Sequence, residues 1–123
     1  MKVYAYDGCD TCRKALAYLK STGRDYHLLA IRETPPSKAE LRQMLKLYQG
    51  KVKALFNVSG QDYRALGLGA KLDKMTDEQA IELLSKNGNL VKRPFVLVGN
   101  TGAVGFKENE WLDKGLRQLP KGL

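Results

Sequence analysis

The spacing of apolar residues changes several times along the chain, and each change predicts an element. Alternating β-prone residues near the start predict a strand. Apolar residues at helical spacing then predict a helix that stops at Gly23, because glycine accepts the left-handed conformation common after helix ends. A second β-prone stretch follows and is ended by two prolines. The predicted elements are a strand at 2–6, a helix at 11–23 and a strand at 25–31.

Two capping boxes predict helix starts in the middle of the chain. Residues 37–40 read Ser-Lys-Ala-Glu and residues 76–79 read Thr-Asp-Glu-Gln, and such pairs satisfy free backbone amides in a first helical turn. The two helices should end before Gly50 and near Asn87-Gly88. Stretches 51–58 and 62–68 between them are expected to be short and partly helical. The predicted core-facing residues are Leu41, Met44, Leu45 and Tyr48 in the first helix and Ala80, Ile81, Leu83 and Leu84 in the second.

The last third of the chain predicts a β-hairpin and a final helix. An apolar strand after Pro94, a glycine-containing turn and a second short strand form the hairpin, and the helix covers 108–116. The order is therefore β-α-β, a helical insert at about 37–88, and β-β-α. This order matches the α/β thioredoxin-like arrangement, a mixed β-sheet covered by helices. We expect one such domain over residues 1–123.

Composition and charge narrow the possible functions. With 123 residues and 43% apolar content, the chain can bury one core. It contains neither an apolar run of about 20 residues nor a secretory signal, which predicts a cytoplasmic protein without a membrane span. The net charge of +8 suits an anionic partner, but lysine and arginine are spread over the chain in runs no longer than two. Direct binding of nucleic acid is therefore not expected.

The two cysteines of the chain lie in the sequence Gly-Cys-Asp-Thr-Cys-Arg at residues 8–13. A reducing compartment keeps most thiols free, so a close pair there favours catalysis or metal binding over a structural disulfide. Zinc needs about four ligands, and beyond the pair the chain offers one histidine, His27, and carboxylates. We therefore expect no metal and favour a redox role. Two buried cysteines that pack as small apolar side chains remain the structural alternative.

The position of the pair suits thiol chemistry. Cys9 precedes a predicted helix, where the helix dipole and free amides stabilise a thiolate, and the backbone amide of Cys12 can point at its sulfur. Arg13 and Lys14 add positive charge nearby. Cys12 lies three residues further on, from where it can attack a mixed disulfide formed on Cys9.

Arg93-Pro94 is the second candidate element, because it opens a strand after a helix. In a thioredoxin-like fold such a proline is usually cis and faces the cysteine loop, so Arg93 would bring its donors to an oxyanion or thiolate. His27 is expected to be a strand residue rather than a catalytic base. The aromatic residues Tyr63, Phe106 and Trp111 are expected in or beside the core.

Taken together, these segments resemble the arsenate reductase and Spx family from Val3 to about Leu116. The resemblance implies a thioredoxin-like core with a helical insertion, a nucleophilic cysteine at Cys9 and an anion-contacting arginine at Arg93. The matching segments are CDTCRKALAYL, PPSKAEL, ALFNVSGQDYRALGL, LDKMTDEQAIELL, NLVKRPFVLV and VGFKENEW.

The chain also differs from the arsenate-reducing members of that family. Those members carry two further arginines for the oxyanion, whose positions match Asn57 and Phe106 here, with Lys107 as the alternative to Phe106. Spx-type regulators carry a Cys-x-x-Cys switch and bind the RNA polymerase α subunit, and their glycine at the polymerase-contacting surface resembles Gly50. The segments CDT and FNVSG are similar to members linked to glutathione-dependent thiol reduction.

The sequence therefore predicts a monomeric thiol-disulfide oxidoreductase with weak or absent arsenate reductase activity. Glutathione as co-substrate, or a glutaredoxin, would restore the dithiol, and no bound cofactor is expected. A redox-switched Spx-type regulator that binds RNA polymerase is the alternative. The candidate catalytic residues are Cys9, Cys12 and Arg93, and the candidate substrate-binding residues are Arg13, Asn57, Pro94 and Lys107.

Overall fold

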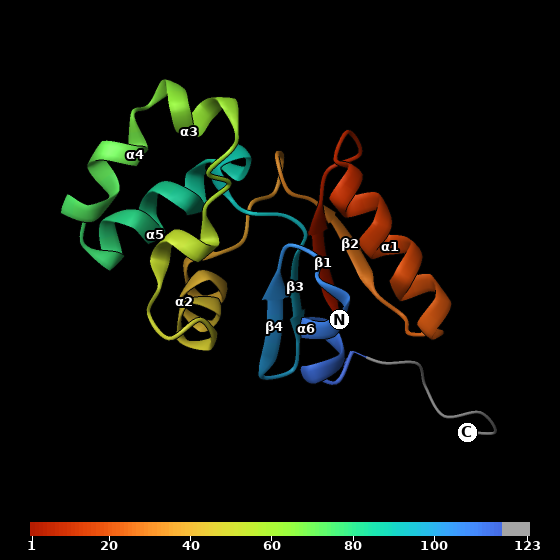
Figure 1. Ribbon diagram of the computed structural model, residues 1–123. Coiled ribbons are helices and arrows are strands. Elements are labelled where there is room, and N and C mark those ends of the chain that lie inside the picture. The colour runs from red at the N-terminus through yellow and green to blue at the C-terminus, as the bar shows by residue number, and fades with distance from the viewer. Residues whose placement is uncertain (117–123) are drawn as a thin grey trace.

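The structure is a computed structural model that describes residues 1–116 (Figure 1). Its strands are β1 (Lys2–Ala5), β2 (His27–Ala30), β3 (Phe95–Val98) and β4 (Thr101–Val104). Its α-helices are α1 (Asp10–Thr22), α2 (Lys38–Leu47), α3 (Gln61–Ala65), α4 (Leu68–Lys71), α5 (Asp77–Lys86) and α6 (Glu108–Asp113). Three 3-10 turns are η1 (Val52–Leu55), η2 (Leu72–Lys74) and η3 (Gly88–Leu90).

The four strands form one mixed sheet in the order β2-β1-β3-β4. β1 pairs with β2 in parallel, whereas β3 pairs antiparallel with both β1 and β4. This topology confirms the predicted α/β thioredoxin-like arrangement, with α2 to α5 inserted between β2 and β3. The second strand is shorter than the predicted 25–31: it begins two residues later, at His27, and ends one residue earlier, because the chain turns away after Ala30.

Helices cover both faces of the sheet, and the alternation of side chains along each strand divides the core between them. On one face Tyr4, Phe95 and Leu97 pack with the inserted helices. On the other face Val3 and Val96 pack with residues of α1 and α6. Figure 1 shows the insert on one side of the sheet and α1 on the other. The loop between β1 and α1 lies at the end of the sheet where the carboxyl ends of the parallel strands β1 and β2 meet.

Local sequence signals explain where the main helices begin and end. Gly23 closes α1 with φ of 74°, as its sequence position predicts. Both predicted capping boxes are present: Ser37 exchanges hydrogen bonds with Glu40 at the start of α2, and Thr76 does so with Gln79 at the start of α5. Of the predicted core residues in these helices, Tyr48 and Leu83 are only half-buried.

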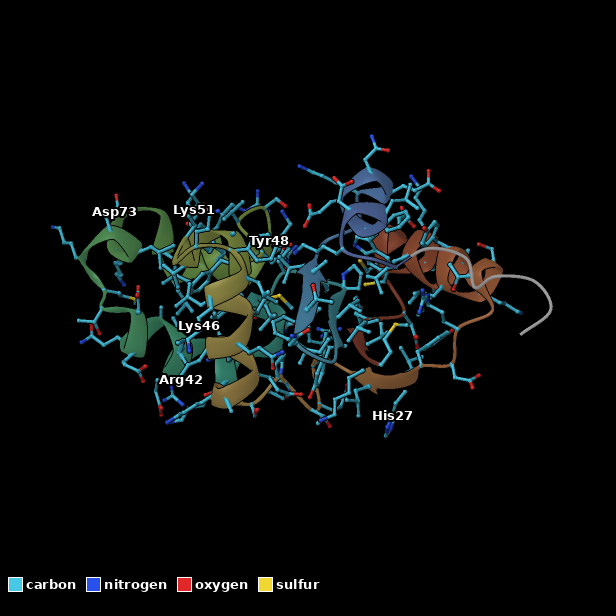
Figure 2. The ribbon with its side chains drawn as sticks, turned by 90° about the horizontal axis from the view of Figure 1, so that it is seen from below. His27, Arg42, Lys46, Tyr48, Lys51 and Asp73 are labelled. Carbon is cyan, nitrogen blue, oxygen red and sulfur yellow. The ribbon has the colours of Figure 1, made fainter. Side chains whose placement is uncertain are left out.

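The expectations for single aromatic and histidine residues are also met. Trp111 is fully buried, Tyr63 is nearly so, and Phe106 is half-buried against Trp111 with ring centroids 4.8 Å apart. His27 is an exposed residue of the edge strand β2, and Figure 2 shows its side chain pointing outward. No helix among residues 1–116 is long and apolar enough to cross a membrane.

Gly88 allows the segment after β2 and the segment before β3 to approach each other closely. A Cβ atom on Gly88 would lie 1.8 Å from the carbonyl oxygen of Ile31 and 2.9 Å from Cα of Arg32. Both neighbours are backbone atoms, so they cannot move away as a flexible side chain would. The absence of a side chain at residue 88 therefore fixes the distance between the end of β2 and the segment that runs into β3.

We expect Gly88→Ala to destabilise the protein by about 3 kcal/mol or more, because the methyl group forces the backbone apart. Gly69→Ala is the matched control: it lies in α4 with nothing within 4 Å of the added Cβ, and it should stabilise the protein by about 0.5–1 kcal/mol. Urea unfolding followed by circular dichroism measures both. Equal midpoints for the two variants would contradict this account.

Candidate functional site

The two cysteines lie at the junction of β1 and α1, and both are free thiols in the structure. Cys9 is the N-cap of α1, with φ of −103° and ψ of 115°, and its sulfur accepts a hydrogen bond from the backbone N–H of Cys12 at 3.2 Å. Cysteine here takes the place of the oxygen-bearing residues that usually cap helices. The predicted amide contact is therefore confirmed, and it places the Cys9 sulfur at the positive end of the α1 dipole.

The two thiols differ in exposure. Cys9 is half-buried, whereas Cys12 is 1% exposed and lies on the buried face of α1 among apolar residues. Burial raises the pKa of the Cys12 thiol to about 12, with a contribution from its hydrogen bond to Cys9, while a backbone hydrogen bond with Tyr6 and the charge of Arg93 act in the opposite direction. Cys12 is therefore held protonated at neutral pH. Cys9 is half-buried rather than buried, so the alternative of two buried structural cysteines does not describe this pair.

We expect alkylation at pH 7 to label Cys9 first, because Cys12 is buried and its raised pKa leaves it almost entirely as the unreactive thiol. Limited iodoacetamide treatment followed by peptide mass mapping measures the order of labelling. Labelling of Cys12 should accelerate as the pH rises from neutral toward 12. Preferential labelling of Cys12 at pH 7 would contradict the assignment.

Cys9 opens onto a hollow of about 510 Å³ that we call the cysteine hollow. Three other predicted site residues, Asn57, Arg93 and Lys107, line it together with Cys9. They come from four separate parts of the chain, so the fold brings them together. Further residues around the hollow include Thr11, Tyr48, Lys92, Phe106 and Glu110.

Backbone pairing places Asn57 beside Arg93. The N–H of Asn57 donates to the carbonyl of Leu90 at 2.8 Å, and the N–H of Lys92 donates to the carbonyl of Leu55 at the same distance. Phe56 forms a β-bridge with Val91 between these two bonds. The bond between Arg93 and Pro94 is cis, as predicted.

The other two predicted substrate-binding residues do not line the cysteine hollow. Arg13 is exposed, forms an ion pair with Asp10, and lines a different hollow beside Cys12 and β2. Pro94 is buried, and its carbonyl accepts a hydrogen bond from the N–H of Gly105 at 2.9 Å. Arg13 lies on the exposed side of α1. Its position next to Cys12 in the sequence did not indicate on which side of the helix its side chain lies.

Arg93 also contacts the ring of Tyr6. Its guanidinium carbon lies 5.1 Å from the centroid of that ring, and the guanidinium carbon of Arg32 lies 4.5 Å from the same centroid. A Cβ on Gly8 would lie 2.7 Å from the Tyr6 ring, so the cysteine loop packs directly against the ring. Tyr6 and Arg32 were not among the predicted site residues. The sequence could have indicated them, because Tyr6 follows β1 and Arg32 follows β2, and the carboxyl ends of two parallel strands lie at the same end of the sheet.

Tyr48 is a further residue that the sequence did not assign to the site. It lies at the end of α2, where Figure 2 labels it, and its hydroxyl donates to Glu110 at 2.5 Å while accepting from the N–H of Val104 at 3.0 Å. Burial, followed by the bond to Glu110, raises the pKa of Tyr48. The neutral phenol therefore joins the insert to β4 beside the cysteine hollow. Within residues 1–116, no three histidine, cysteine, aspartate or glutamate side chains converge as a metal site would require.

A mixed sheet in the order β2-β1-β3-β4, covered by helices and with a Cys-x-x-Cys pair at the first strand-to-helix junction, defines a thioredoxin-like protein. The ArsC family pattern matches residues 4–114, and the chain belongs to the ArsC family. This confirms the resemblance that its segments indicate.

Three relatives and one solved structure illustrate the range of the family. The chain is 41% identical over 108 residues to the uncharacterized protein YusI of Bacillus subtilis (strain 168), covering 88% of this chain and 92% of YusI. It is 32% identical to an arsenate reductase of Escherichia coli over 77% of this chain and 66% of that one. It is 27% identical to the global transcriptional regulator Spx of Listeria innocua over 88% and 81%. A crystal structure of an ArsC-family-related protein from Bacteroides fragilis superposes with a TM-score of 0.85 and 39% identity, covering 91% of this chain and 94% of that one.

Proposed function

We propose that this protein is a thiol-disulfide oxidoreductase in which Cys9 attacks a substrate disulfide and Cys12 resolves the product. The observation that carries the proposal is the contrast within the pair: Cys9 caps α1 at the cysteine hollow, and Cys12 is a buried, protonated thiol hydrogen-bonded to it. A capping thiolate gains the helix amides, and a buried partner three residues away is held for the second step.

The proposed reaction has two exchange steps. The Cys9 thiolate attacks one sulfur of a disulfide, so that the Cys9 mixed disulfide forms and the other half leaves as a thiolate, which takes up a proton. The Cys12 thiol then loses its proton and attacks the Cys9 sulfur, which forms the Cys9–Cys12 disulfide and releases the second thiol. Two electrons pass from the protein to the substrate. Two molecules of glutathione, or a reduced glutaredoxin, return them and restore the dithiol.

Arg93 is proposed to stabilise the negative charge in these steps. It lines the cysteine hollow, and its charge favours ionisation of Cys12, which would help that buried thiol when it must attack. Asn57 and Lys107 are proposed as substrate contacts because they line the same hollow. Arg13 is not included, since it lines a different hollow.

The proposal is tested by following NADPH consumption in a mixture of the protein, glutathione, glutathione reductase and hydroxyethyl disulfide. We expect sustained turnover above the rate without protein, and intact mass should show the loss of two hydrogens when the isolated protein is oxidised mildly. Two free thiols that persist after oxidation, together with no turnover, would overturn the proposal.

A redox-switched regulator is the second candidate, and the Spx relative that aligns with 88% of this chain favours it. Gly50, the residue that resembles the polymerase-contacting glycine of Spx, lies exposed beyond α2 with φ of 77° and with open space around it. Such a protein would bind the RNA polymerase α subunit, and formation of the Cys9–Cys12 disulfide would change the affinity.

Binding of purified α subunit to the reduced and oxidised protein tests this second candidate. Gly50→Arg should abolish binding if Gly50 marks the contact. Gly23→Arg is the matched control, because it also places arginine at a positive φ with open space, but at the end of α1. Binding without sustained disulfide turnover would favour the regulator over the enzyme.

A further inference from the structure

A second hollow of about 170 Å³ adjoins the cysteine hollow, and Asn57 and Arg93 line both. We call it the arginine hollow. Its walls come from the loop after β1, the segment after β2, the start of α3 and the segment after α5. The lining residues that matter here are Tyr6, Arg32, Asn57, Asp62, Asn89 and Arg93.

Two guanidinium groups share one aromatic ring in this hollow. Arg32 lies 4.5 Å and Arg93 5.1 Å from the centroid of Tyr6. Stacking on a ring holds a guanidinium in a fixed plane, which pre-organises its donors for a planar, bidentate acceptor. Two like charges at one ring repel each other, and an anion bound between them would relieve that repulsion.

Arg93 presents a donor with no acceptor in the structure. Its Nη1 atom is buried and has no hydrogen-bond partner. A buried, unpaired donor on a charged group is costly, because the group has lost water and gained nothing in exchange. Asn57 and Asn89 place amide groups in the same hollow.

The single carboxylate of the hollow does not neutralise these arginines. Asp62 lies in the first turn of α3 and is exposed, and among residues 1–116 no ion pair joins it to Arg32 or Arg93. The arginine hollow therefore keeps a net positive charge and the unpaired Arg93 donor, and it shares Asn57 and Arg93 with the hollow that Cys9 lines.

We propose that the arginine hollow binds a carboxylate of a peptide thiol or peptide disulfide whose sulfur reacts at Cys9. This inference rests on the proposed function and adds the preferred substrate class: short acidic thiol peptides of the glutathione kind, in preference to neutral disulfides. Asn57 and Arg93 line both hollows, and an extended tripeptide spans about 10 Å, so a ligand with its sulfur at Cys9 is long enough to place a carboxylate in the arginine hollow. Arg32 supplies the binding contact furthest from the sulfur, and Tyr6 holds both arginines in place.

The test separates binding from chemistry by using S-methylglutathione, which keeps both carboxylates but has no reactive thiol. Titration of the native protein, followed by ¹⁵N NMR and calorimetry, should shift the side-chain amide signals of Asn57 and Asn89. Arg32→Gln should weaken this binding about tenfold, the effect of losing one charge-assisted contact. Arg64→Gln is the matched control, since it removes the same charge from exposed α3 outside the hollow and should leave binding unchanged.

Kinetics complete the test. In single-turnover reactions of the pre-reduced protein without free glutathione, Arg32→Gln should slow oxidation by glutathione disulfide about tenfold, whereas Arg64→Gln should react at the native rate. Equal S-methylglutathione affinity in Arg32→Gln and Arg64→Gln, or displacement of the ligand by equimolar inorganic phosphate, would overturn the carboxylate assignment even if disulfide turnover is normal. Absence of turnover with every disulfide, while S-methylglutathione binds as described, would instead remove the proposed function and keep the binding site.

Discussion

Replacing Cys9 by serine should lower disulfide reductase turnover by about a thousandfold or more while the fold stays intact. A serine hydroxyl is a far weaker nucleophile than a thiolate toward sulfur, so the first exchange step is lost. The same hydroxyl is a preferred helix cap and can accept the Cys12 N–H that the Cys9 sulfur accepts at 3.2 Å. Activity and stability should therefore separate: turnover disappears, and the urea midpoint stays equal or rises.

Cys12→Ser is the matched variant, since it removes the other sulfur of the pair. Cys9 can still attack, but no thiol of the protein resolves the product, so treatment with glutathione disulfide and no free glutathione should leave a mixed disulfide on Cys9 that appears in the intact mass. Because Cys12 is 1% exposed among apolar residues, the serine also introduces a buried hydroxyl and should cost about 1–3 kcal/mol of stability. Retained turnover in Cys9→Ser, or a mixed disulfide on Cys12 in that variant, would reverse the assigned roles.

The kcat/KM for arsenate should be lower by roughly a hundredfold or more than that of a family member that carries all three arginines. Binding an oxyanion beside a thiolate favours several guanidinium groups that converge on one small site. The cysteine hollow contains Arg93 as its guanidinium, while Asn57 and Phe106 stand where the resemblance places two more. Phe106 packs on Trp111, so it serves the core as well as the hollow. Lys92 and Lys107 supply charge there without the planar, bidentate donors of arginine.

The arsenate prediction is checked by coupled NADPH consumption with glutathione, glutaredoxin and arsenate. Asn57→Arg should raise kcat/KM for arsenate, because it adds a guanidinium at the rim of the cysteine hollow. Val58→Arg is the matched control: it adds the same charge one residue away, at an exposed position outside the lining of the hollow, and should change little. Turnover of arsenate by the native protein at the rate of an arginine-complete relative would show that the account of Asn57 and Phe106 is wrong.

Most of the fold follows from local signals in the sequence. The two capping boxes and Gly23 set helix ends through hydrogen bonds between residues three apart or through a single backbone conformation, so a short stretch of sequence contains all the information. The order of strands and helices then restricted the topology to a thioredoxin-like sheet. The bounds of short elements were less predictable: β2 begins two residues later and ends one residue earlier than predicted, and α6 ends at Asp113 rather than at 116.

For the site, the sequence by itself determined the cysteine pair, its position at a helix start and the Arg93-Pro94 element, because each depends on residues close together in the chain. Only the tertiary structure decided which distant residues join them. It places Asn57 and Lys107 around Cys9, Arg13 in another hollow, and Arg32 beside Arg93 on the ring of Tyr6. The physical reason is that backbone pairing between 55–57 and 90–92 sets Asn57 beside Arg93, and the close approach of Gly88 to Ile31 fixes the segment that carries Arg32. Both are contacts between segments far apart in sequence.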